Sequence, residues 1–230
     1  MKQKLPISKS EKVSRELSEQ MIREQLLPRG ITNKKVIEAM LRVPRECFVP
    51  LIRKLHAYED RALPIGYGQT ISQPYTVARM IEALQLRGTE RVLEIGTGSG
   101  YAAAVLGCLA SDVHTLERIK PLARLARARL SQMGFINVHV HLVSGTVGFA
   151  ERAPYDAIIV AAGAAELPPA LLDQLADGGR IVIPIGETPD YQTLYRFTKL
   201  GTNIEKESLG DFVFVPLIGA HGWNARQVVS

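Results

Sequence analysis

The segment Val92-Leu-Glu-Ile-Gly-Thr-Gly-Ser-Gly-Tyr101 decides the fold class of this chain. Its apolar first half predicts a buried strand over residues 91–95, and a helical pattern over residues 100–110 follows the three alternating glycines. Glycines between a strand and a helix let a ligand approach the backbone closely. We therefore predict a nucleotide-like cofactor at this loop, held by Gly96, Thr97, Gly98, Ser99 and Gly100.

The spacing of the glycines narrows the class of cofactor. A dinucleotide fingerprint needs its third glycine three residues after the second, and that position holds the bulky Tyr101. The loop also lacks the Gly-Lys-Ser/Thr sequence that cradles the phosphates of ATP or GTP. The spacing thus argues against NAD and favours S-adenosylmethionine.

Two acidic residues lie at the ends of predicted strands. Glu117 follows the strand over residues 113–116, where a carboxylate can accept hydrogen bonds from both ribose hydroxyls. Glu94 ends the first strand, and we predict that it accepts a hydrogen bond from the cofactor's ammonium group, directly or through water. A capped or solvated carboxylate is the alternative for Glu94.

Downstream of the loop, strands and helices alternate, which indicates a parallel sheet wound by helices. Two further strand-like runs, 192–198 and 212–217, have no helical pattern between them and predict a terminal antiparallel pair. We expect an α/β fold with a doubly wound, mostly parallel seven-stranded sheet. Its other predicted elements are strands at 138–143, 155–161 and 180–185 and helices at 121–133 and 168–175.

Two amphipathic patterns precede the sheet. One runs from Val13 to Ile22 and stops at Pro28-Arg-Gly30, and the other covers residues 36–41 with Thr32 or Asn33 as its N-terminal cap. We predict one methyltransferase domain over residues 1–230. Its expected parts are a loose basic tail at 1–10, N-terminal helices and a substrate loop at 11–75, a cofactor-binding core at 76–222 and a tail at 223–230.

The composition excludes several classes of protein. No apolar run approaches the roughly 20 residues that cross a bilayer, so a cytoplasmic protein without a membrane partner is expected. Cys47 and Cys108 suggest neither a disulfide framework nor a metal site. The net charge of +5 could indicate a nucleic-acid partner, but the basic residues at 118–129 alternate with an apolar stripe that includes Leu125. We therefore predict that these bases form a solvated helix face.

The segment Gly66-Tyr-Gly-Gln-Thr-Ile-Ser-Gln-Pro-Tyr75 strongly resembles the signature of protein-L-isoaspartate O-methyltransferases. Further segments resemble the same family in the same order, and the likeness extends over residues 14–222. The resemblance implies a class I, Rossmann-like methyltransferase fold with S-adenosyl-L-methionine as cofactor. These further segments are 43–50, 92–101, 153–159, 178–186 and 214–217.

The resemblance also implies an activity. Members of this family methylate the α-carboxylate that an isoaspartyl linkage exposes in damaged proteins and peptides, and the resulting ester collapses to a succinimide that can reopen correctly. In the family, a serine lies between the cofactor and the substrate carboxylate, and it corresponds to Ser72 here. The alternative role for Ser72 is that of a turn residue whose hydroxyl bonds to its own backbone. Thr70, Ile71 and Tyr75 match positions near the cofactor. Isoaspartyl proteins are the expected partners, with a monomer as the default.

One position departs from the family pattern. Where relatives usually have Gly-Asp-Gly after the third strand, this chain has Val143-Ser144-Gly145. In the family this acid lies near the adenine amino group. Ser144 can accept a hydrogen bond there but carries no charge, and a charge-assisted bond is stronger by roughly 1 kcal/mol. We predict that Ser144 and Gly145 adjoin the cofactor and that binding is weakened, not abolished.

Two other functions stay open. A nucleic-acid methyltransferase would agree with the net charge, but Val160-Ala-Ala-Gly-Ala-Ala165 offers no polar group to hold an exocyclic amine. A cofactor-binding relative with weakened or lost turnover would agree with Ser144. The intact Thr70-Ile-Ser72 and Glu117 argue against that second alternative.

Overall fold

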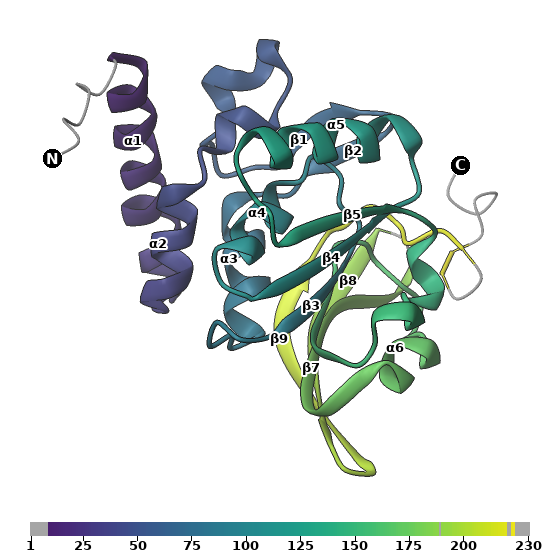
Figure 1. Cartoon of the computed structure of the whole chain (residues 1–230). Helices are drawn as coiled ribbons and strands as arrows, with labels where there is room; N and C mark the ends of the chain where they lie inside the picture. The colour runs from purple at the N-terminus through teal and green to yellow at the C-terminus, as the bar shows by residue number, and fades with distance from the viewer. Residues whose placement is uncertain (1–8, 189, 220–221, 224–230) are drawn as a thin grey trace, which may run out of the picture.

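The computed structural model describes residues 9–188, 190–219 and 222–223. The tails predicted at 1–10 and 223–230 lie outside these residues, apart from Lys9, Ser10 and Trp223. A seven-stranded sheet with the order β5-β4-β3-β6-β7-β8-β9 forms the centre of the molecule (Figure 1). The first five strands in this order are parallel, and β8 and β9 are antiparallel to their neighbours. The predicted fold class is confirmed.

The strands have the following bounds. Because the strands of the parallel part run in the same direction, their carboxyl ends share one edge of the sheet, where β3 and β4 end at the two acids and the glycine loop follows β3. They are β3 (Arg91–Ile95), β4 (Asp112–Glu117), β5 (Val138–Leu142), β6 (Tyr155–Val160), β7 (Leu175–Thr188), β8 (Tyr191–Leu200) and β9 (Asn203–Phe212).

Apolar side chains cover both faces of the sheet. Val92 points to a core that the N-terminal helices, α3, α4 and α5 complete, whereas Leu93 points to a second core beneath α6. Burial on both faces explains why the central strands are nearly continuous apolar runs. The helices are α3 (Pro74–Ala83), α4 (Tyr101–Gly107), α5 (Lys120–Gln132) and α6 (Pro169–Asp173).

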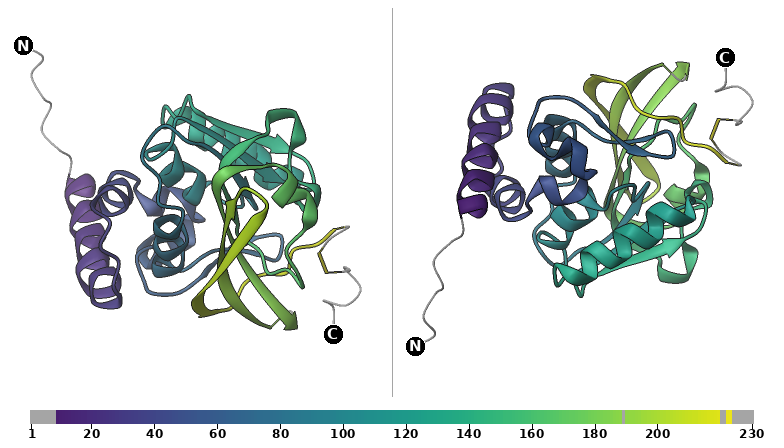
Figure 2. Two further views of the ribbon diagram at one scale, coloured as in Figure 1. Left: turned by 90° about the horizontal axis from the view of Figure 1, so that it is seen from below. Right: turned by 90° about the horizontal axis from the view of Figure 1, so that it is seen from above.

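Two N-terminal helices, α1 (Lys9–Met21) and α2 (Lys34–Arg42), lie outside α3 and α4, on the flank away from the sheet (Figure 2). Asn33 is the cap of α2, because its side chain accepts hydrogen bonds from Lys35 N and Val36 N at 3.0 and 3.4 Å. A π-helical turn (Ile22–Leu26) and a 3₁₀ turn (Leu27–Arg29) extend α1 to Gly30. None of the helices in the described part of the chain could span a membrane.

The prediction of a last strand at 212–217 is wrong. The partner of β8 is β9, a charged strand with the sequence NIEKESLGDF, and residues 213–217 leave the sheet. An edge strand that exposes most of its side chains needs no apolar alternation, so the pattern missed it. The apolar residues after it cover a pocket instead of a sheet face.

The solvated face predicted for α5 needs two corrections. Arg129 is half-buried, and its Nη1 donates a 2.5 Å hydrogen bond to Ser99 O. Leu125, expected in the apolar stripe, is 49% exposed, because the buried stripe of α5 follows Leu122, Ala126 and Leu130.

A short hairpin that the sequence did not reveal precedes α3. Its strands β1 (Leu63–Gly66) and β2 (Gln69–Ile71) pair antiparallel around a turn in which Tyr67 has a φ of 56°. The hairpin lies outside the main sheet and brings residues 69–72 to the edge where the parallel strands end.

Candidate active site

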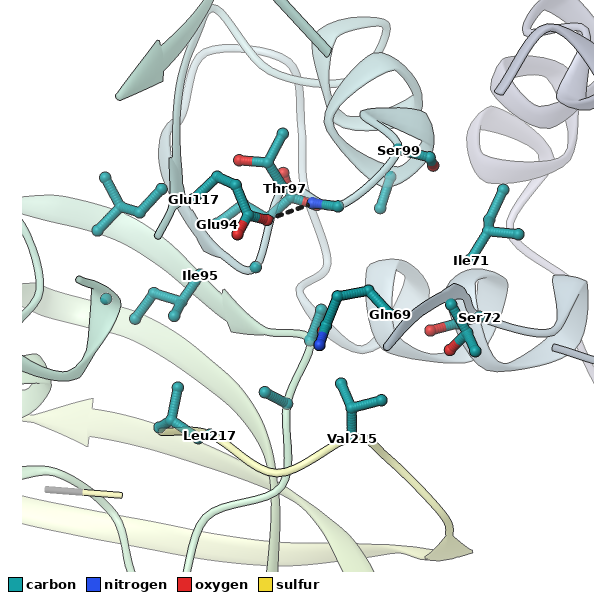
Figure 3. Close-up of a pocket in the computed structure, with 18 of the residues that line it drawn as sticks. Gln69, Ile71, Ser72, Glu94, Ile95, Thr97, Ser99, Glu117, Val215 and Leu217 are labelled. Atoms are coloured by element: carbon teal, nitrogen blue, oxygen red, sulfur yellow. Dashed lines mark hydrogen bonds between the residues drawn. The ribbon is translucent and has the colours of Figure 1, made fainter. Parts of the chain in front are cut away.

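A pocket opens at the carboxyl ends of β3, β4 and β6, where the glycine loop turns into α4 (Figure 3). The backbone N–H groups of Gly96 and Thr97 both donate to Leu116 O, at 3.0 and 3.1 Å, which ties the loop to the neighbouring strand. Gly96, Gly98 and Gly100 have φ values of 96°, 52° and 89°. These left-handed values are strained for other residues, so the glycines are required by the turn.

Glu117 lines one wall of the pocket and is held there by two backbone groups. Its Oε2 accepts a 2.9 Å hydrogen bond from Gly98 N and its Oε1 a 2.8 Å bond from Ile119 N. The side chain is only 6% exposed. A carboxylate offers about four acceptor positions, so two remain for hydroxyl donors of a ligand.

Glu94 is completely buried beside it. Thr115 Oγ1 donates a 2.5 Å hydrogen bond to Oε2, while Oε1 has no hydrogen-bond partner among the residues that the structure describes. Burial raises the pKa of Glu94 to about 8; the Thr115 hydrogen bond opposes this shift, and the Glu117 charge adds to it. Once the carboxyl is ionised, Oε1 is a buried acceptor without a donor, which is costly, so it fits an incoming ammonium group.

Ser72 lies on the opposite wall, just after the hairpin (Figure 3). Behind it a second hollow opens toward the end of β9, lined by Arg29, Asp60 and residues 209–215. Thr70, Ser72, Ala161 and Val215 line both hollows. The Ser72 side chain is therefore at the boundary between a site with two acids and an open groove.

The structure brings ten of the thirteen predicted site residues together around the pocket. They are Thr70, Ile71, Ser72, Glu94, Gly96, Thr97, Gly98, Ser99, Glu117 and Gly145. A Cβ at Gly145 would lie 2.2 Å from Ile95 Cγ2, so only glycine fits beside the end of β3.

Three predicted residues do not line this pocket. Tyr75 lines the second hollow, where its ring stacks on Phe212. Gly100 packs behind the loop, where a Cβ would lie 3.3 Å from Ala126 Cβ. Ser144 is exposed and its Oγ lies 3.4 Å from Thr146 Oγ1, although the next residue, Gly145, does line the pocket.

Residues 215–218 also line the pocket, which was not predicted from the sequence. This segment is held beside the end of β6, since Gly163 N donates to Val215 O at 2.8 Å and Leu217 N donates to Gly163 O at 2.7 Å. Its apolar pattern was visible but was assigned to a strand. Ala161 and Ala162 were also missed, although the carboxyl end of a central parallel strand is a signal for a ligand site.

Comparisons with known proteins agree on one family. Residues 16–222 match the family model described as protein-L-isoaspartate(D-aspartate) O-methyltransferase. The protein-L-isoaspartate O-methyltransferase 2 of Marinobacter nauticus is 57% identical over 204 residues, which cover 88% of this chain and 93% of the relative. A protein-L-isoaspartate O-methyltransferase of Dictyoglomus thermophilum is 54% identical, covering 87% and 90%.

Solved structures give the same result. One protein-L-isoaspartate O-methyltransferase superposes with a TM-score of 0.78 at 28% identity and covers 90% of this chain and 66% of its own. A putative enzyme of this name from Plasmodium falciparum, in complex with S-adenosyl-L-homocysteine, has a TM-score of 0.74 at 29% identity, covering 89% and 98%. This chain belongs to the protein-L-isoaspartate O-methyltransferase family of S-adenosylmethionine-dependent enzymes.

Proposed function

We propose that this chain esterifies the free α-carboxylate of L-isoaspartyl residues in damaged proteins and peptides, with Ser72 as the residue that orients the carboxylate. The observation that carries the proposal is the position of Ser72 on the boundary of two hollows. One hollow holds the acceptors that suit the cofactor, and the other is open to a peptide.

The cofactor side has a donor–acceptor pattern that suits S-adenosylmethionine. Glu117 has acceptor positions left for the two ribose hydroxyls. Oε1 of Glu94, which has no partner among the described residues, can accept a hydrogen bond from the methionyl ammonium group. When bound, the cofactor supplies an electrophilic methyl group on a sulfonium sulfur. Gly96 and Gly98 leave the backbone free of side chains at this approach.

The reaction requires no general base from the protein. A carboxylate is already ionised at neutral pH, so it needs orientation and not proton removal. The Ser72 hydroxyl can donate one hydrogen bond to a carboxylate oxygen and leave the second oxygen to attack. Positioning of this kind and exclusion of water provide the catalysis.

The open hollow supports an extended peptide as the substrate. The edge strand β9 and residues 213–215 border it, and an edge strand offers unpaired main-chain groups. Arg29 adds a polar wall, because its guanidinium pairs with Asp60 at 3.1 Å and lies 3.4 Å from the centroid of the Tyr75 ring. Recognition through main-chain contacts suits a lesion of the backbone itself.

Methyl transfer from labelled cofactor tests the proposal directly. We expect transfer to a peptide with one isoaspartyl residue and none to the same peptide with a normal aspartyl residue or to RNA. Transfer to RNA alone would make the chain a nucleic-acid methyltransferase. Cofactor binding without any transfer would make it a relative that has lost turnover, and either result would overturn the proposal.

A further inference from the structure

The turn η3 (Arg45–Phe48) belongs to one of the segments that resemble the family, yet no role for it follows from the sequence. Arg45 and Phe48 are both buried, with 0% and 1% of their surfaces exposed. Arginine is almost never fully buried unless it is paired, so its burial here needs an explanation.

Arg45 binds two backbone carbonyls. Its Nη2 donates a 2.6 Å hydrogen bond to Ser72 O, and its Nε donates a 2.7 Å bond to Ala57 O. The rigid fork of the guanidinium thereby fixes the main chain of Ser72 relative to the segment at residue 57. Ser72 receives this bond at its carbonyl, so its hydroxyl is left for a ligand.

The Arg45 guanidinium also packs against a ring on the cofactor side of the site. Its central carbon lies 4.8 Å from the centroid of the Tyr101 ring, and Tyr101 both begins α4 and lines the pocket directly after the glycine loop. Phe48 meets the Tyr101 ring edge-on at 5.5 Å. The turn η3 is thus wedged between the Ser72 wall and the glycine loop.

A second arginine completes the arrangement. Arg129 on α5 lies 5.4 Å from the centroid of the Phe48 ring and donates to Ser99 O in the glycine loop. Arg129, Phe48, Tyr101 and Arg45 form a row in which each guanidinium lies over one ring and the two rings meet edge to face. Each end of this row holds a carbonyl of the site, Ser99 on the cofactor wall and Ser72 on the substrate wall.

Burying the Arg45 guanidinium in this row costs free energy. Within the described part of the chain no carboxylate forms an ion pair with Arg45, and its buried guanidinium interacts with the neutral Tyr101 hydroxyl instead. A buried charge without a counterion costs free energy that an apolar side chain of similar volume avoids. Packing alone therefore does not account for an arginine at position 45.

We infer that Arg45 is a positioning residue that holds Ser72 at a set distance from the glycine loop. It does so through the row that it forms with Tyr101, Phe48 and Arg129. The inference rests on the proposed role of Ser72 in orienting the substrate. Its consequence is a division of labour: Arg45 acts on turnover through Ser72, and Arg129 acts on cofactor binding through Ser99.

Substitutions at the two arginines test this division. In Arg45→Lys a single ammonium cannot reproduce the fork that spans two carbonyls, and Arg45→Met removes both bonds. A displacement of about 1 Å at a reacting centre can cost roughly 100-fold. We expect kcat to fall about 10-fold in Arg45→Lys and about 100-fold in Arg45→Met, with the cofactor Kd within about 3-fold of the original.

Arg129→Met should do the reverse, raising the cofactor Kd and keeping most of kcat at saturation. Arg124→Met is the matched control, because Arg124 is an exposed arginine on the same helix. It should leave kcat and Kd unchanged. A rise of the cofactor Kd in parallel with the loss of kcat in Arg45→Lys would overturn the inference.

Coupling to Ser72 separates positioning from general destabilisation. In a Ser72→Ala background, Arg45→Lys should cost no further kcat, since the hydroxyl that it positions is already gone. The same loss in both backgrounds would show that Arg45 does not act through Ser72.

Hydrogen exchange gives a readout that needs no turnover. Amides in residues 69–76 should exchange faster in Arg45→Lys than in the original protein, because the carbonyl tether of Ser72 is loosened. Unchanged exchange there would overturn the inference, even if Arg45→Met fails to fold. Failure of the original protein to methylate an isoaspartyl peptide would instead reject the proposed function, and the exchange result would still decide the role of Arg45.

Discussion

The cofactor wall and the substrate wall of the site are built in different ways. Glu94 and Glu117 extend from neighbouring parallel strands, and backbone N–H groups hold Glu117 in place. Ser72 and Val215 come to line the same pocket only in the folded chain, and a buried side chain, Arg45, holds the Ser72 carbonyl. The cofactor wall therefore depends on strand register and the substrate wall on tertiary packing.

This difference separates two kinds of failure. A change in the acids of the cofactor wall should alter cofactor affinity, because these residues are preorganised acceptors. A change in the substrate wall should alter turnover at saturating cofactor. A cofactor-wall variant that lowers turnover at saturating cofactor, or a substrate-wall variant that weakens cofactor binding, would contradict this separation.

Glu117→Ala should have the largest effect. It removes the acceptor that we propose for two ribose hydroxyls and leaves Gly98 N and Ile119 N without their partner. Each hydrogen bond to a charged group contributes about 1.5–3 kcal/mol, so we expect the cofactor Kd to rise more than roughly 100-fold. Calorimetric titration measures this. A Kd within about 3-fold of the original would place the cofactor elsewhere.

Ser72→Ala should lower kcat by roughly 10- to 100-fold, which corresponds to the loss of one hydrogen bond to a carboxylate. The cofactor Kd should stay within about 2-fold, because the proposed methionyl and ribose acceptors, Glu94 and Glu117, lie on the opposite wall. Steady-state methylation of an isoaspartyl peptide, together with calorimetry, measures both quantities. Equal losses in kcat and cofactor affinity would move Ser72 into a purely cofactor-binding role.

Glu94 should make cofactor binding depend on pH. Its pKa of about 8 in the free protein means that the side chain is mostly protonated at pH 7, whereas an ammonium ligand favours the carboxylate. Binding at pH 7 should therefore release close to one proton, and affinity should rise up to about 10-fold per pH unit below 8. Calorimetry in buffers of different ionisation enthalpy detects the proton, and its absence would contradict this role.

The same carboxyl group should affect stability without cofactor. The unfolded chain releases this proton near pH 4.5 and the folded chain near pH 8, so the folded state binds more protons between these values. The stability of the protein relative to Glu94→Gln should therefore decline as the pH rises from 4.5 to 8. Melting temperatures measured in parallel check the sign, and a constant difference would contradict it.

Ser144→Asp should have the smallest effect. If residue 144 adjoins the adenine amino group when the cofactor is bound, a carboxylate there should tighten binding by about 1 kcal/mol, roughly 5-fold. The exposed position of Ser144 next to Gly145 leaves room for the longer side chain. Unchanged or looser binding in a calorimetric titration would show that residue 144 has no part in the cofactor site.

The parallel half of the fold was predictable because its signals are local. Central strands are buried on both faces and the glycines between β3 and α4 are required by their φ values, so both features are visible in a short window of sequence. The hairpin β1–β2 and the edge strand β9 were not predictable in this way. One is very short, and the other exposes most of its charged side chains to solvent.

By itself the sequence determined the class of fold, the class of cofactor and the two acids, since strand, glycine turn and strand-end acid follow one another in the chain. Tertiary structure alone decided that residues 215–218 close the pocket and that Tyr75 faces the second hollow. It also decided that Arg45 is buried against Ser72 O. The physical reason is distance along the chain: such contacts form only when the core brings remote segments together, and no local pattern encodes them.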